Sequence, residues 1–172
     1  MIKKIVLALV VLLAIAQVVR PNKNNSRDTQ KDISTLYPMP DDVKVIVNKA
    51  CADCHTNNTN YPFYANIQPI AYWLEDHVKE GKRHFNFNEF ASYKIAKQNH
   101  KLEEVIEQIK EGEMPLYSYT LIHKEARLTD AEKETLTNWC QSIMDSLKAT
   151  YPADSLVIKK NSQNLRVNSL RI

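Results

Sequence analysis

Apolar and polar positions alternate along much of this chain with the period of a helix. Two stretches, "HKLEEVIEQIKEG" and "LTDAEKETLTNWCQSIMDSL", place apolar residues three and four positions apart, which puts them on one helix face. The first stretch stops at Gly112, a residue typical of helix ends. The second opens with Thr129 and has Glu132 three positions later, the pattern of a capping box. Both stretches therefore predict long helices.

Helices are also expected on both sides of a cysteine-containing segment. One begins at the aspartates of residues 41–42, which suit the start of a helix, and runs directly into that segment. Another starts near Pro69 and is expected to end at Gly81. A short helix follows Asn88, whereas residues 113–128 show no period and are expected to be irregular.

Composition supports an all-α fold. The chain has 172 residues, of which 44% are hydrophobic, so it can build a core, but only two are glycines, which leaves little material for tight turns or hairpins. Residues 28–149 carry 14 basic and 19 acidic side chains, whereas both ends are basic. A nucleic-acid binder needs a basic face on its folded domain, so this distribution does not favour one.

The N-terminus has the features of an export segment. Lys3 and Lys4 precede an apolar run that extends from Ile5 to Val19. Ala14-Ile15-Ala16 fits a cleavage site, but the run could also remain as an anchor, although its 15 residues fall below the roughly 17–25 that usually span a bilayer. The two lysines keep the N-terminus inside, so under either alternative the rest of the chain is expected on the periplasmic side of the inner membrane.

The chain is expected to divide into four parts. They are a signal or anchor segment (1–20), a polar linker (21–37), a helical domain (38–149) and a polar, basic tail (150–172).

The segment Cys51-Ala52-Asp53-Cys54-His55 carries the chemistry of the domain. Cysteines at i and i+3 lie on one side of a helical turn, at the separation that two haem vinyl groups demand, and the adjacent His55 then points at the iron. A zinc site would need a second ligand pair, which Cys140 and the other histidines do not form. A redox dithiol would be expected in a βαβ context. The pattern therefore favours one covalent haem c held by Cys51 and Cys54.

Met114 is the best candidate for the second axial ligand of the iron. It lies 59 residues after His55 in the context Gly-x-Met-Pro, where Pro115 prevents the helix from continuing and holds the segment as a loop. A thioether is a soft ligand that raises the reduction potential of a haem. The rival is His77, on the apolar stripe of the second helix, although a histidine there is more often buried and hydrogen-bonded.

Haem also needs an apolar wall, for which the chain offers several aromatic and aliphatic residues. The candidates are Tyr61, Phe63, Tyr64, Trp73, Leu102, Ile106, Tyr117 and Trp139, together with Pro115. Trp139 is expected to pack against the helix that precedes the cysteines. Cys140 is either a small buried apolar residue or the site of an intermolecular disulfide.

Longer stretches of the sequence resemble the haem-binding-domain family of small, membrane-anchored bacterial c-type cytochromes. The matching pieces are "RPNKNN", "CADCHTNNTNYPFYANIQPIAYWLEDHVKEGKRHFNFNEF", "GEMPLYSYTLIHKEARLT" and "LTNWC", which together cover roughly residues 18–145. The resemblance implies a class I cytochrome c-like helical domain with covalent haem through Cys51 and Cys54, proximal ligation by His55 and Met114 opposite. It names no partner.

The leading hypothesis for function is a periplasmic one-electron carrier with one haem and His/Met ligation, which exchanges electrons with redox proteins of the cell envelope. Nothing else in the sequence resembles a catalytic group, so an enzyme is not expected. The alternative is a haem sensor or peroxidase-like enzyme with an open or displaceable sixth site, in which His77 or His84 acts as a distal base. A third hypothesis is a haem-containing interaction module of an envelope complex.

Overall fold

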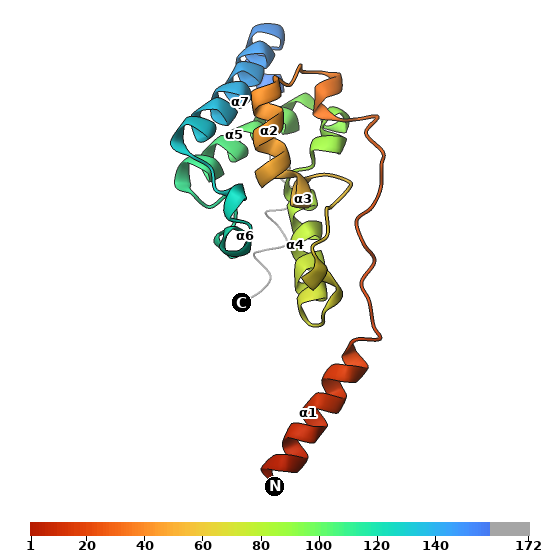
Figure 1. The fold of residues 1–172 in the computed structure, drawn as a ribbon. Helices are drawn as coiled ribbons and strands as arrows, with labels where there is room; N and C mark the ends of the chain where they lie inside the picture. Colours follow the sequence, from red (N-terminus) through yellow and green to blue (C-terminus); the bar gives the residue numbers. More distant parts are fainter. Residues whose placement is uncertain (159–172) are drawn as a thin grey trace, which may run out of the picture.

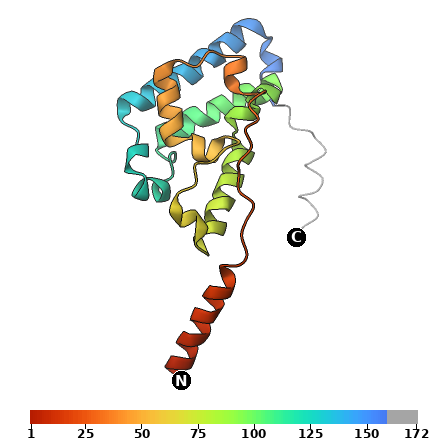
Figure 2. The ribbon, with the colours of Figure 1, turned by 45° about the vertical axis from the view of Figure 1, so that its right-hand side comes forward.

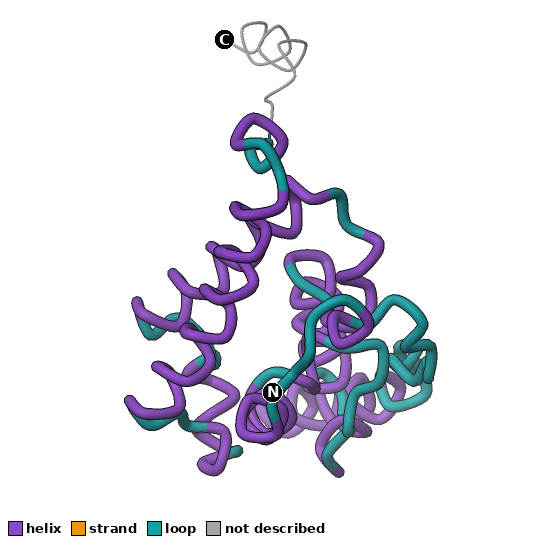
Figure 3. The backbone as a smooth tube through the Cα atoms, turned by 90° about the horizontal axis from the view of Figure 1, so that it is seen from above, coloured by secondary structure: helices purple, strands orange, loops and turns teal. Residues whose placement is uncertain are grey.

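The computed structural model describes residues 1–158, and within them the expectation of an all-helical protein is confirmed. The α-helices are α1 (Ile2–Ala16), α2 (Asp41–Ala50), α3 (Ala52–His55), α4 (Ile70–His84), α5 (Ile95–Glu111), α6 (Tyr117–Ile122) and α7 (Asp130–Thr150). Short 3-10 helices are η1 (Ile33–Thr35), η2 (Phe63–Asn66), η3 (Phe87–Ser92), η4 (Lys124–Ala126) and η5 (Ala153–Ser155). Over this part of the chain no strand is drawn (Figure 3), and the β-type pairing is confined to an isolated bridge between Asn25 and Asn58.

Helix α1 projects from one end of a bundle formed by the other helices (Figures 1 and 2). It is apolar apart from Lys3 and Lys4 in its first turn, and it has no buried residue. None of the helices among residues 1–158 has both the length and the apolar character needed to cross a membrane.

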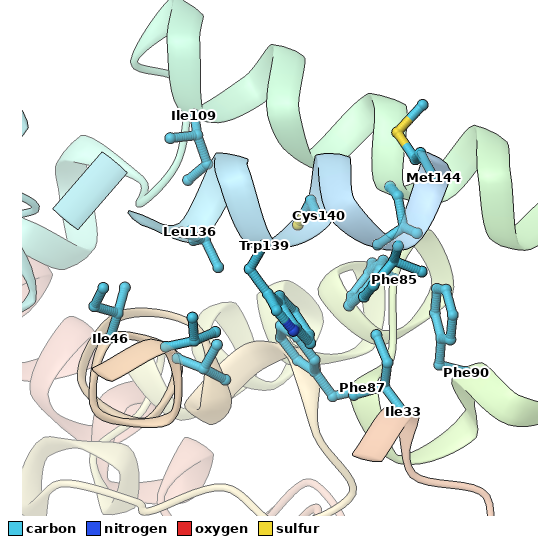
Figure 4. Close-up of a cluster of buried hydrophobic side chains, with 14 of the residues drawn as sticks. Ile33, Ile46, Phe85, Phe87, Phe90, Ile109, Leu136, Trp139, Cys140 and Met144 are labelled. Atoms are coloured by element: carbon cyan, nitrogen blue, oxygen red, sulfur yellow. The ribbon is translucent and has the colours of Figure 1, made fainter. Parts of the chain in front are cut away.

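The core lies where α2, α5 and α7 meet. Helix α7 starts with the expected capping box of Thr129 and Glu132, and its apolar stripe is buried. Trp139 points from α7 toward Phe87 (Figure 4), and its indole Nε1 donates to the carbonyl oxygen of Pro38 at 3.1 Å. Trp139 thus packs beside α2, as expected, and Cys140 is a buried member of the same cluster.

The segment between α1 and α2 lies along the side of the bundle (Figure 1). Ile33 is fully buried in the core. Asn24 is also buried, and its Nδ2 donates at 2.9 Å both to the carbonyl oxygen of Thr56 and to Thr59 Oγ1. Although polar in sequence, residues 21–37 are therefore attached to the domain along much of their length. Of the expected tail, residues 159–172 lie outside the described part of the chain.

Three local expectations were wrong. Gly81 does not end its helix, because α4 continues to His84. Helix α5 begins at Ile95 and so includes a turn that the apolar pattern did not indicate, although it ends as expected at Gly112, whose φ is 77°. Residues 113–128 are not irregular throughout, since α6 and η4 lie within them.

Candidate functional site

The cysteine motif sits on a single helical turn that is tied to the helix before it. The amide of Cys51 donates to the carbonyl oxygen of Val47, and the amide of His55 donates to the carbonyl oxygen of Cys51, both at 2.9 Å. Helix α2 thereby fixes α3, with a change of direction at Cys51. The turn brings Cys51, Cys54 and His55 to the wall of the same cavity.

This cavity has a volume of about 710 Å³, within the range of roughly 300–1,000 Å³ that small-molecule and cofactor sites occupy. Its walls come from α3, α4, α5 and the segment from Met114 to Tyr119. The apolar part of the lining consists of Phe85, Phe87, Val105, Ile109, Leu116 and Leu136.

Helix α4 approaches the motif closely enough that one position must be glycine. A Cβ atom at Gly81 would lie 2.7 Å from the carbonyl oxygen of Cys54, a distance that real Cβ atoms do not show. The main chain of α4 therefore packs directly against α3. Gly81 is needed here for close approach rather than for a turn, which is why the sequence pattern misplaced its role.

His55 is oriented by the chain just beyond α4. Its Nδ1 lies 2.9 Å from the carbonyl oxygen of Phe85, an acceptor, so Nδ1 carries the proton and donates it. The remaining nitrogen, Nε2, is then the unprotonated one and has the lone pair that a metal requires. Burial lowers the pKa of His55, which favours this neutral form.

Both thiols are held in their protonated forms in the chain without haem. Burial, helped by the nearby Cys54, raises the pKa of Cys51 to about 12. Burial, helped by Asp53, raises the pKa of Cys54 to about 11. Since a thiolate is the form that attacks a disulfide, these surroundings do not favour a reactive dithiol at neutral pH.

Met114 and Pro115 line the same cavity as the cysteines, as a sixth ligand and its neighbour would. Gly112 ends α5 in a left-handed conformation, and the amides of Glu113 and Met114 both donate to the carbonyl oxygen of Gln108, at 3.0 and 3.2 Å. The side chain of Met114 is half-buried and packs against the core. The turn after α5 thus directs the chain along the cavity before α6 begins.

Tyr119 ties α6 to the turn that carries the cysteines, α3. Its hydroxyl donates to Asp53 Oδ2 at 2.8 Å, and burial and this bond raise the pKa of Tyr119 well above its ordinary value, so it remains a donor. Its ring stacks on His123 with centroids 4.4 Å apart, and His123 Nε2 lies 2.6 Å from the Tyr64 hydroxyl. The pair Tyr119–Asp53 spans 66 residues of sequence, so no local pattern could have indicated it.

The two other candidate histidines also line the cavity. His77 Nδ1 donates to the carbonyl oxygen of Trp73 at 2.8 Å, and its ring lies against the Trp73 ring. The side chain of His84 is 67% exposed and lies 3.8 Å from a carboxylate oxygen of Glu80. His77 is therefore hydrogen-bonded, as expected, but only half-buried, and both rings remain near the site.

Of the nine expected wall residues, Pro115 lines the cavity and the other eight lie outside its lining: Tyr61, Phe63, Tyr64, Trp73, Leu102, Ile106, Tyr117 and Trp139. Tyr117 is 75% exposed, because α6 turns its other face inward, and Trp73 is 47% exposed. Tyr61 is drawn away by its hydroxyl, which donates to Glu75 Oε2 at 2.6 Å and accepts from the Asn24 amide at 2.7 Å. Tyr119 and Phe85, which sequence reasoning did not single out, occupy the wall instead.

The donor set fits a covalent haem. Two protonated thiols, an imidazole whose Nε2 has a lone pair and a thioether all reach one cavity with an apolar lining. The family model described as a haem-binding domain matches residues 11–142, a range that contains all four of these side chains. No curated protein and no solved structure matches the chain. The chain belongs to the haem-binding-domain family and binds haem.

Proposed function

We propose that this protein is a monohaem c-type cytochrome that carries single electrons. The observation that carries the proposal is the convergence of Cys51, Cys54, His55 and Met114 on one cavity of about 710 Å³. The two cysteines would hold the haem covalently by thioether bonds, and His55 and Met114 would supply the axial ligands. When bound, the haem provides an iron that alternates between the ferric and ferrous states.

The residues of the chain then set the properties of that iron. The Phe85 carbonyl fixes the ring of His55 and increases its basicity as a ligand. The thioether of Met114 favours the ferrous state and raises the reduction potential. The apolar wall formed by residues such as Val105 and Ile109 would exclude water, which also raises the reduction potential.

The geometry of the cavity also favours a carrier over an enzyme. Gly81 lets α4 pack directly on α3, and the Tyr119–Asp53 hydrogen bond holds the Met114 side of the cavity to the same turn. His55 and Met114 would then fill both axial positions, so the iron would have no open coordination site for a substrate. This is the arrangement that rapid electron exchange with other redox proteins requires.

The location that we propose is the periplasmic side of the inner membrane. Lys3 and Lys4 in the first turn of α1, with the apolar residues that follow them, support export with the N-terminus retained inside. The segment would act either as an anchor or as a cleaved signal. The partners would be redox proteins of the cell envelope rather than nucleic acid, in keeping with the acidic surplus of residues 28–149.

A second candidate function rests on His77 and His84, which both line the cavity. If Met114 were displaced from the iron, these side chains could serve as proton donors or acceptors in a haem sensor or a peroxidase-like enzyme. The carrier is favoured because Met114 lines the same cavity as His55, and the Tyr119–Asp53 hydrogen bond ties the helix that follows Met114 to α3.

A haem stain on a denaturing gel, combined with a reduced-minus-oxidised spectrum, tests the proposal. We expect the stain to remain with the denatured chain, which shows covalent attachment, and the reduced chain to bind carbon monoxide slowly or not at all. Haem that leaves the denatured chain would contradict a c-type cytochrome. Rapid and complete binding of carbon monoxide would instead favour the sensor or peroxidase-like alternative.

A further inference from the structure

One end of the domain carries a group of exposed apolar side chains that the haem site does not use. Phe63 is 81% exposed. The others are between 40% and 47% exposed, and they are Ile67, Ile70, Tyr72 and Trp73. All five lie on η2, the following loop and the first turn of α4. We refer to these five residues as the η2–α4 patch. A concentration of large exposed apolar side chains marks an interaction surface.

The η2–α4 patch lies at the end of the domain from which α1 projects (Figures 1 and 2). Hydrogen bonds join the two directly. Gln68, which is buried within the patch sequence, donates its amide to Gln17 Oε1 at 2.9 Å and its Nε2 to the carbonyl oxygen of Val19 at 2.7 Å. The end of α1 is therefore fastened to the loop that carries the patch.

Two cations stand at this junction. Arg20 donates to the carbonyl oxygen of Asn66, and Lys23 Nζ donates to Asn66 Oδ1 at 3.0 Å. Lys23 also lies over the ring of Tyr61, 5.1 Å from its centroid. Basic side chains beside tryptophan, tyrosine and aliphatic residues form the combination that sits at the boundary between lipid headgroups and acyl chains.

We propose that the η2–α4 patch, with Arg20 and Lys23, rests on the surface of the phospholipid bilayer from which α1 extends. This inference rests on the envelope location given under Proposed function. It adds a second membrane contact, which prevents the domain from swinging freely about the end of α1. Helix α4 would then set the height of the haem site, because the 15 residues from Ile70 to His84 span about 21 Å along the helix axis.

Photolabelling from the lipid tests this proposal. The full chain with its haem is reconstituted in vesicles of phosphatidylcholine and phosphatidylglycerol that contain a phosphatidylcholine with a diazirine near its glycerol. Adducts are then mapped by mass spectrometry. We expect adducts on residues 61–73 as well as on residues 1–19. Helix α6 provides an internal control, because Tyr117, Leu121 and Ile122 are similarly exposed but should remain unlabelled.

Two matched variants sharpen the experiment. Phe63→Asp should reduce labelling of residues 61–73 by about tenfold, since it removes a large apolar side chain from the interface. Leu121→Asp should leave that labelling unchanged. The double variant Arg20→Gln/Lys23→Gln should lower labelling on the anionic vesicles and have no effect on vesicles of phosphatidylcholine alone.

The possible failures are distinguishable. Adducts confined to residues 1–19, or equally strong on α6, would overturn the patch proposal while leaving a membrane-attached cytochrome in place. The absence of adducts from the whole chain would overturn both the patch proposal and the anchoring of the chain by α1. Loss of covalent haem on the denaturing gel would overturn the cytochrome function, whereas labelling of residues 61–73 would still support the membrane contact.

Discussion

The two sides of the haem cavity are held by different kinds of interaction. On the side of α3 and α4 the main chain dominates: Gly81 packs against the Cys54 carbonyl, and the Phe85 carbonyl accepts from His55. On the side of Met114, the link to α3 is a hydrogen bond between two side chains, Tyr119 and Asp53. Main-chain packing tolerates little change, whereas a single side-chain hydrogen bond can be removed cleanly. The cysteine side should therefore be fixed and the methionine side adjustable.

The largest effect is expected from the thiols. In Cys51→Ala/Cys54→Ala both thioether bonds are lost, so the haem stain should disappear completely from the denaturing gel. Cys140→Ala provides the matched control, because Cys140 is buried in the core and does not line the cavity. Full staining of the double cysteine variant would show that the haem is attached elsewhere.

The next largest effect is expected from Gly81→Val, which disturbs the packing on the side of α3 and α4. Any Cβ at this position meets the Cys54 carbonyl oxygen at 2.7 Å, so α3 and α4 must separate, at a cost of about 1–3 kcal/mol in the free energy of unfolding. Urea unfolding and haem incorporation measure the effect.

Gly112→Ala is the control for Gly81→Val. Gly112 has a φ of 77° but no neighbour within 4 Å of an added Cβ, so the alanine should cost about 1 kcal/mol in stability without reducing haem incorporation. Equal losses of haem in the two glycine variants would contradict a role for close packing at Gly81.

On the adjustable side, Met114→Ala should leave the haem covalently attached and change its ligation. Because the thioether favours the ferrous state, its removal should lower the midpoint potential by on the order of 0.1 V, a fraction of the roughly 0.8 V over which axial ligands act. The ferric variant should also bind imidazole more tightly, measured by optical titration. A second substitution, His77→Ala, should leave both quantities near those of the unaltered chain if Met114 is the ligand.

Tyr119→Phe should have the smallest effect. It removes one hydrogen bond to a carboxylate in a half-buried setting, so a loss of about 1 kcal/mol in stability is expected, with up to about tenfold faster displacement of Met114 by imidazole. Stopped-flow mixing of the ferric chain with imidazole gives the rate. Tyr117→Phe is the control, since Tyr117 is 75% exposed and outside the cavity lining. Identical rates of imidazole binding in the two tyrosine variants would show that the Tyr119–Asp53 hydrogen bond does not hold Met114 in place.

The same contrast explains what the sequence could predict. Cys51, Cys54 and His55 are contiguous, so their shared helical turn follows from spacing alone. The place of Met114 in the cavity could be predicted from its local Gly-x-Met-Pro context. The capping box of α7 could be predicted from two residues three positions apart. These features depend on neighbours in the sequence, which a periodic pattern records.

Features that depend on distant neighbours were missed or misplaced. Gly81 was expected to end α4, because nothing in the pattern shows that the Cys54 carbonyl lies against it. Tyr61 and Tyr117 were expected in the wall because they are aromatic, yet Tyr61 is bound to Asn24 and Glu75, and Tyr117 faces outward. Tyr119 lies in the wall instead, where it is held by its hydrogen bond to Asp53, a residue 66 positions earlier in the sequence.

The far-red absorption of the ferric chain tests the central claim most directly. Coordination of the iron by the Met114 thioether should give a weak charge-transfer band in this region, and the band should vanish in Met114→Ala while the haem remains attached. His77→Ala should retain it. Absence of the band from the unaltered chain, together with rapid binding of carbon monoxide after reduction, would contradict His55/Met114 ligation and the electron-carrier function built on it.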